Sequence, residues 1–206
     1  MATHPPAQPS TRRRSSQSTR DRIVRAAIDL FTTQGYHATT TPQVAAAAGV
    51  AEGSIYRHFE SKQVLLNELY RAALRLLLAP ITAATGSCRD RLEHIAATWC
   101  EVAGHDPAPV RLVFFTRFPG LLDPKSRDLA AELRVALGRI LVEGKSSGEI
   151  RPGSVDLWSD LWITIIGLPL ERICDKTWSA RDPITQLALR SAWRAIHPDE
   201  GHSTDA

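Results

Sequence analysis

The sequence of 206 residues is poor in cysteine, and its three cysteines, Cys88, Cys100 and Cys174, form no CxxC pair. Cysteines spaced this widely are typical of small buried side chains in a reducing compartment. Aromatic residues make up only 6% of the chain, and no uninterrupted apolar run reaches the ~18 residues that a membrane helix requires. The composition therefore argues against a disulfide framework, a metal site and a membrane anchor, and favours a cytoplasmic protein.

Motifs that mark common enzyme classes are also missing. The sequence contains no GxSxG, HExxH, P-loop or GxGxxG motif, and no His, Asp and Glu cluster with metal-ligand spacing. These absences argue against an enzyme and against a bound cofactor.

Positive charge is concentrated near the start of the chain. Residues 1–75 contain ten Lys and Arg against five Asp and Glu, a net of +5, whereas the remainder carries a net of −2. A basic N-terminal part (residues 1–75, the head) on a slightly acidic remainder (the body) indicates that only the head binds a polyanion. A protein that coats DNA along its whole surface would need basic residues throughout, so the acidic body disfavours that class.

Helical periodicity extends over most of the chain, and no segment alternates apolar and polar residues with period two. Ser18 starts the first helix and Gly35 ends it. In the second half, helices are expected near residues 88–104, 107–118, 125–146, 155–173 and 183–196. The sequence predicts an all-α protein with a disordered basic leader (1–17), a helix-turn-helix domain (18–64), a helical body (65–197) and a disordered tail (198–206).

The arginines of the leader, Arg12, Arg13 and Arg14, allow two interpretations. They could reach into a minor groove as an arm, or they could remain solvated and contribute only non-specific attraction. The composition favours the second interpretation.

The segment from Thr41 to Phe59 has the parts of a helix-turn-helix. Thr41 is expected to cap a helix with Pro42 at its first position, and Gly49 supplies the tight turn to a second short helix. With Ile55 facing the core, a step of 100° per residue points Gly53 and Arg57 outward. Ser54 and Tyr56 flank them on the face that would enter a major groove. The spacing alone is equally compatible with an ordinary corner between two helices.

The segment from Arg22 to Leu66 resembles the N-terminal domain of the TetR family of transcriptional regulators. The matching residues are an AA…LF…GY…TT run, then VA…AGV, then G-x-x-Y-x-H-F-x-x-K followed by leucine. Ala51 stands where the family often has serine, and Gln63 replaces the usual glutamate. The resemblance implies three DNA-binding helices, a ligand-binding body and a homodimer. It also implies phosphate contacts from Thr40 or Thr41, Tyr56, His58 and Lys62.

The body contains most of the large aromatic side chains. A family body encloses a mostly apolar pocket between its middle helices. We expect the walls of this pocket to come from Trp99, Phe115, Phe118 and Trp162, with His94, Arg117 or Cys100 as a polar contact. The alternative for each aromatic residue is an ordinary place in the core.

The last two helices carry apolar stripes that predict a dimer interface. Two such helices from each subunit would form a four-helix interface. The candidate interface residues are Leu161, Ile165, Leu168, Ile184, Leu187 and Ser191.

These patterns together predict a homodimeric repressor that binds palindromic operator DNA and is released by a small, mostly apolar effector. In the alternative interpretation the head still binds DNA, but the body only dimerises or binds a protein partner.

Overall fold

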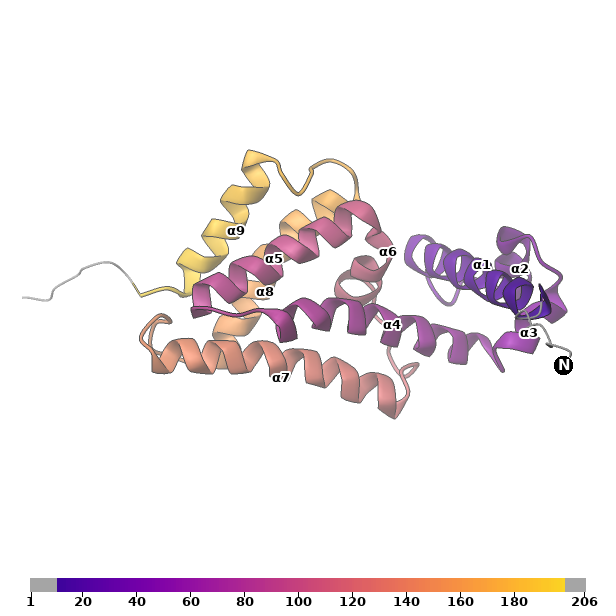
Figure 1. Cartoon of the computed structure of the whole chain (residues 1–206), viewed down its shortest axis with the longest axis horizontal. Helices are drawn as coiled ribbons and strands as arrows, with labels where there is room; N and C mark the ends of the chain where they lie inside the picture. Colours follow the sequence, from indigo (N-terminus) through magenta and orange to yellow (C-terminus); the bar gives the residue numbers. More distant parts are fainter. Residues whose placement is uncertain (1–10, 199–206) are drawn as a thin grey trace, which may run out of the picture. The chain divides into compact units, whose positions relative to one another are not determined.

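A computed structural model describes residues 11–198, with side chains from Ser18 onward, and every regular element in this range is helical (Figure 1). The all-α prediction is therefore confirmed. The chain divides into two compact units after Leu69, whereas the sequence predicts a boundary between residues 64 and 65. The expectations for residues 1–10 and 199–206 lie outside the described residues.

The first unit contains α1 (Thr11–Thr33), α2 (Thr41–Ala48), α3 (Glu52–His58) and the first turns of α4 (Lys62–Ala83). α1 begins at Thr11, whereas the sequence predicts its start at Ser18. The stretch from Thr11 to Gln17 contains neither proline nor glycine, and arginine and glutamine are good helix formers. A helix that is already nucleated extends into such a stretch at little cost.

Apolar side chains at helical spacing form the core of the first unit. On α1, Ile23, Ala27 and Phe31 lie one turn apart and are fully buried. The other core residues are Val44, Ala45, Ala48, Ile55, Phe59, Leu65 and Leu66.

The second unit contains the rest of α4, then α5 (Cys88–His105), α6 (Pro107–Val110), a π-helical turn η1 (Arg111–Phe115), α7 (Pro124–Ser146), α8 (Val155–Cys174) and α9 (Pro183–Ile196). Small polar side chains accept hydrogen bonds from the first turn of four of these helices, and therefore fix where they start. These N-caps are Ser87 for α5, Asp106 for α6, Asp123 for α7 and Ser154 for α8.

The helix expected over residues 107–118 is shorter than predicted. It continues from α6 into η1 and ends at Phe115, after which Thr116 is extended. The Thr116 hydroxyl donates to the Arg111 carbonyl at 2.9 Å and satisfies an acceptor at the end of the π turn. Pro119 restricts the residue before it to extended conformations, which also opposes a helix through Phe118.

Candidate DNA-binding surface

The start of α2 is closed by a reciprocal capping box. The Gln43 backbone N–H donates to Thr40 Oγ1 at 3.4 Å, and the Thr40 N–H donates to Gln43 Oε1 at 2.7 Å. The N-cap is therefore Thr40, not Thr41 as the sequence predicts, because Gln43 lies three residues after Thr40 and completes the S/T-x-x-Q pattern. Thr41 becomes the first helical residue, and Pro42 follows it within the first turn.

Gly49 makes the turn between α2 and α3. Its backbone has φ 62° and ψ 41°, a left-handed conformation in which glycine has no Cβ penalty. Arg22 lies over the turn and donates to the Gly49 carbonyl. A Cβ added to Gly49 would meet Arg22 Nη2 at 2.7 Å. The backbone conformation therefore favours glycine here, and a larger residue would also have to shift the Arg22 guanidinium.

The exposed face of α3 presents Gly53, Tyr56 and Arg57, as the helical step predicts. Tyr56 is 54% exposed, and its hydroxyl donates to Thr41 Oγ1 at 3.4 Å. Ser54, expected to flank this face, is instead only 7% exposed, so its predicted outward position is wrong. Ser54 lies one position before the core residue Ile55, and the short α3 packs both side chains inward.

Ser54 nevertheless acts on the exposed face through its neighbour. Arg57 Nη2 donates to Ser54 Oγ at 2.8 Å. The hydroxyl therefore holds one side of the guanidinium and leaves its other N–H groups for a ligand.

Lys62 joins the start of α4 to the loop between α1 and α2. Its ammonium donates to the carbonyls of Tyr36 at 2.8 Å and Thr39 at 2.7 Å, and lies 4.1 Å from the centre of the Tyr36 ring. Burial lowers the pKa of Lys62. Two of its three N–H groups are engaged, so at most one remains for a phosphate. His58 is half-buried at the end of α3, beside Phe59.

Two arginines of α1 organise this surface without having been predicted to do so. Arg20 forms an ion pair with Glu68 of α4 and lies 5.0 Å from the centre of the Phe59 ring, while Arg22 closes the turn at Gly49. The sequence shows both residues only as part of a basic segment. Their roles depend on contacts more than twenty residues away, which helical periodicity cannot reveal.

The predicted pocket residues of the second unit lie in different surroundings. Trp99 and Trp162 are almost fully buried, with ring centres 6.0 Å apart, and Phe118 is also buried against Tyr70. Phe115 is exposed at the end of η1. The expected polar contact His94 lies on the solvent-exposed side of α5, opposite its buried face, so the prediction of a pocket position for His94 is wrong.

The six residues expected at a dimer interface all retain exposed surface. Leu161 and Ile165 are half-buried, and Ser191 is exposed. Leu168 is 48% exposed on α8, and Ile184 and Leu187 of α9 are 48% and 53% exposed. The exposed leucines and isoleucine therefore lie on two helices that pack against each other.

Metal-binding clusters and membrane-spanning helices are both absent from the part of the chain that the structure describes. No group of three His, Cys, Asp or Glu side chains there is placed to hold a metal ion. None of the described helices is both long enough and apolar enough to cross a membrane.

Comparison with known proteins identifies the family. Residues 23–69 match the family of bacterial regulatory proteins named after TetR. The transcriptional regulator TcmR of Streptomyces glaucescens is 31% identical to this chain over 215 residues, which cover 94% of this chain and 89% of TcmR. The chain belongs to the TetR family.

Other relatives agree with this assignment. The transcriptional repressor KstR2 of Mycolicibacterium smegmatis is 28% identical, with 76% of this chain and 77% of KstR2 covered. A TetR-family regulator of Marinobacter aquaeolei has the same fold, with a TM-score of 0.75, 20% identity, and coverage of 91% of this chain and 100% of that protein. FadR of Bacillus subtilis, in complex with stearoyl-CoA, has a TM-score of 0.66 at 21% identity and covers 86% of this chain and 100% of its own.

Membership in this family confirms the resemblance seen in the sequence. The chain is a DNA-binding transcriptional regulator whose helix-turn-helix comprises α2 and α3.

Proposed function

We propose that this regulator is a cytoplasmic homodimeric repressor that binds a palindromic operator and is released by a small, mostly apolar effector. The observation that carries the DNA-binding part is the exposed face of α3. This face combines a backbone open to close approach at Gly53 with an oriented guanidinium at Arg57 and an amphipathic ring at Tyr56. A helix with these groups suits a major groove.

The proposed contacts fall into two classes. Arg57 reads a base edge, because a guanidinium held on one side by Ser54 keeps its free N–H groups in a fixed direction. Thr40, Thr41, Tyr56, His58 and Lys62 meet phosphates and set the register of the head on the duplex. Thr40 and Thr41 lie at the N-terminus of α2, where the helix dipole also favours a phosphate.

The exposed stripes of α8 and α9 support the homodimer. Leu168 and Leu187 are exposed on two helices that pack against each other, which is what an interface spanning both helices would use. A two-fold axis would join it to the same surface of a second copy in a four-helix interface. A dimer of this kind presents two recognition helices and therefore selects a palindrome.

The effector is proposed from the aromatic cluster and from relatives. Phe114 and Trp162 both contact Trp99, with ring centres 5.2 Å and 6.0 Å away, so the middle of the body is apolar. KstR2 is described as a repressor, and FadR of Bacillus subtilis was solved with stearoyl-CoA. In this chain an apolar effector would have to displace an aromatic ring, as in a cryptic pocket.

The close packing of this cluster also supports the second candidate, in which the body only dimerises or binds a protein. Trp99 and Trp162 are almost fully buried, and the Trp99 indole N–H is already bonded to the Leu77 carbonyl at 2.9 Å. Tryptophan fluorescence separates the two candidates. A library of apolar compounds that includes acyl-CoA thioesters should contain one that both shifts the emission and releases DNA if the effector proposal is correct.

Selection from random DNA tests the operator proposal. The purified chain should enrich a two-fold symmetric sequence whose half-sites lie about one helical turn, ~34–36 Å, or a multiple of it apart. Enrichment of an asymmetric sequence, or of none, would contradict the proposal.

A further inference from the structure

An open groove of about 660 Å³ runs between α7 and α8, and it contains none of the residues predicted to bind a ligand. Its α7 side carries a stripe of small residues at spacings of four, three and four: Ala131, Val135, Gly138 and Val142. Val135 and Val142 are each 52% exposed. Such spacing places all four side chains on one face of α7, which lines the groove opposite α8.

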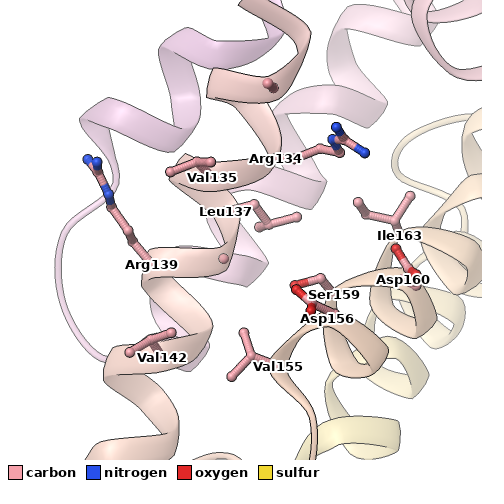
Figure 2. Close-up of a pocket in the computed structure, with 12 residues that line it drawn as sticks. Arg134, Val135, Leu137, Arg139, Val142, Val155, Asp156, Ser159, Asp160 and Ile163 are labelled. Atoms are coloured by element: carbon pink, nitrogen blue, oxygen red, sulfur yellow. The ribbon is translucent and has the colours of Figure 1, made fainter. Parts of the chain in front are cut away.

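The two sides of this α7–α8 groove carry opposite charges. Arg134 and Arg139 lie on α7, whereas Asp156 and Asp160 lie on α8 (Figure 2). All four side chains are exposed, and none of them forms an ion pair among the described residues. In Figure 2, Arg139 points away from the aspartates of its own chain.

This arrangement is complementary to itself. A two-fold axis along the groove turns a second copy so that its aspartate side lies opposite the arginine side of the first, and the reverse pairing follows by symmetry. A two-fold axis across the groove would instead place like charges together. An unrelated partner would need both a matching acidic side and a matching basic side, which a second copy already has.

We propose that the α7–α8 groove is a self-complementary interface at which a second copy of this chain docks, with Arg134 and Arg139 opposite the aspartates of that copy. The small side chains of this stripe leave room on α7 for the α8 side of the second copy, and Gly138 has nothing within 4 Å of an added Cβ.

This interface is distinct from the homodimer surface in the proposed function. At 100° per residue, the α8 residues of the groove and the stripe containing Leu157, Leu161 and Leu168 are centred roughly 150° apart around the helix. One chain can therefore use both surfaces at once, and two dimers would join into a tetramer. Because the paired charges are exposed, the contact is weak and sensitive to salt.

Sedimentation equilibrium of the full chain at low salt tests this inference. Dimers should associate into tetramers at tens of micromolar protein. An arginine-side variant (Arg134→Glu with Arg139→Glu) and an aspartate-side variant (Asp156→Arg with Asp160→Arg) should each weaken tetramer formation about tenfold or more, since attraction becomes repulsion. Each variant should keep the helical circular dichroism of the wild type, because all four side chains are exposed.

Mixing the two variants is the decisive step. When the two variants pair, the new glutamates of one lie opposite the new arginines of the other, and the remaining aspartates lie opposite the remaining arginines. The mixture should therefore form tetramers that neither variant forms alone. Two control variants change the net charge by the same amounts at exposed positions outside the groove. One is Arg75→Glu with Lys125→Glu, and the other is Glu101→Arg with Glu132→Arg. The control variants should behave as wild type both alone and when mixed.

Three outcomes would overturn the inference: association that stops at a dimer unaffected by either groove variant, tetramers that persist in both variants, or a mixture that restores nothing. A wild-type dimer that both groove variants dissociate would leave this inference standing and contradict the proposed homodimer. The two proposals therefore fail separately.

Discussion

Arg57 and Ser54 act together on the recognition helix. The hydroxyl of Ser54 accepts from Arg57 Nη2 at 2.8 Å, although Ser54 itself is buried. If Arg57 reads a base as proposed, Ser54 should influence that reading indirectly, because its hydroxyl fixes the direction of the guanidinium.

We expect Arg57→Ala to relax the preference at one operator base pair, at a cost of about 1–3 kcal/mol in binding free energy. Ser54→Ala should relax the same position by a smaller amount, because the guanidinium remains but is less well oriented. Fluorescence anisotropy with single-base operator variants measures both effects. Arg75→Ala, which removes an exposed arginine of the second unit, is the control. A loss that is uniform over all operator variants would contradict base reading by Arg57.

Lys62→Ala should behave differently from Arg57→Ala. If Lys62 meets a phosphate, its removal should weaken binding to all sequences. The slope of the logarithm of the binding constant against the logarithm of the salt concentration should become shallower by about one. Lys62 also bonds to the carbonyls of Tyr36 and Thr39, so some stability should be lost as well. Weaker binding with an unchanged salt slope would show that Lys62 acts only through the loop.

Gly49→Ala tests the turn between α2 and α3. A left-handed non-glycine residue costs about 1–2 kcal/mol, and the new methyl group would also displace Arg22. We expect the free energy of unfolding of the first unit to fall by roughly 1–3 kcal/mol. Gly53→Ala is the matched control, because Gly53 is helical and has nothing within 4 Å of an added Cβ. Equal stability of the two variants in thermal melts would contradict this explanation of Gly49.

At the scale of elements, the sequence predicts the helices well where a start signal such as proline and an apolar stripe agree. α9, with Pro183 in its first turn, has the predicted bounds Pro183–Ile196. The start of α1 was missed because a basic, polar segment has no stripe, although its residues tolerate a helix. The turn η1 was missed because the pattern of residues 107–118 fits α and π geometry equally well.

The candidate surface was only partly predictable for a related reason. The exposed positions of Gly53, Tyr56 and Arg57 follow from helical geometry once Ile55 faces the core. Burial of Ser54 depends on how α3 packs, and the contact of Arg22 with Gly49 depends on the approach of α1. Tertiary contacts of this kind leave no periodic signal in a single sequence.

The packed pair α8 and α9 carries the next prediction. Leu168→Arg combined with Leu187→Arg should yield a folded monomer, since both side chains are about half exposed within one chain. Light scattering at micromolar concentration should then give a mass near 22.7 kDa instead of about twice that value. Leu76→Arg on α4, which changes a leucine that is 44% exposed, should leave the dimer intact. A wild-type monomer would contradict the assigned interface.

At the scale of the whole molecule, α4 is the one element that belongs to both units among the described residues. It begins with Lys62 in the first unit and continues past Leu69 into the second. Within the second unit, the Leu77 carbonyl of α4 accepts a hydrogen bond from the Trp99 indole at 2.9 Å. A ligand that moves Trp99 therefore alters a contact to the helix that leads into the DNA-binding unit.

This connection predicts that effector and operator oppose each other reciprocally. Recognition helices must lie roughly 34–36 Å apart to enter successive major grooves, so a shift of a few ångströms is sufficient to weaken binding. A coupling free energy of about 1–3 kcal/mol corresponds to a change in affinity of about 5–150-fold.

By linkage, operator DNA must weaken effector binding by the same factor as the effector weakens operator binding. Fluorescence of Trp99 and Trp162 can report the titration, because their rings lie in the apolar cluster that the effector is proposed to enter. The compound that releases operator in the library screen is titrated twice, with and without saturating operator, and a scrambled duplex of equal length serves as the control. The dissociation constant should rise only with operator. Equal constants in all three titrations would mean that the compound binds without differential affinity for the two states, and such a ligand cannot shift the equilibrium between them.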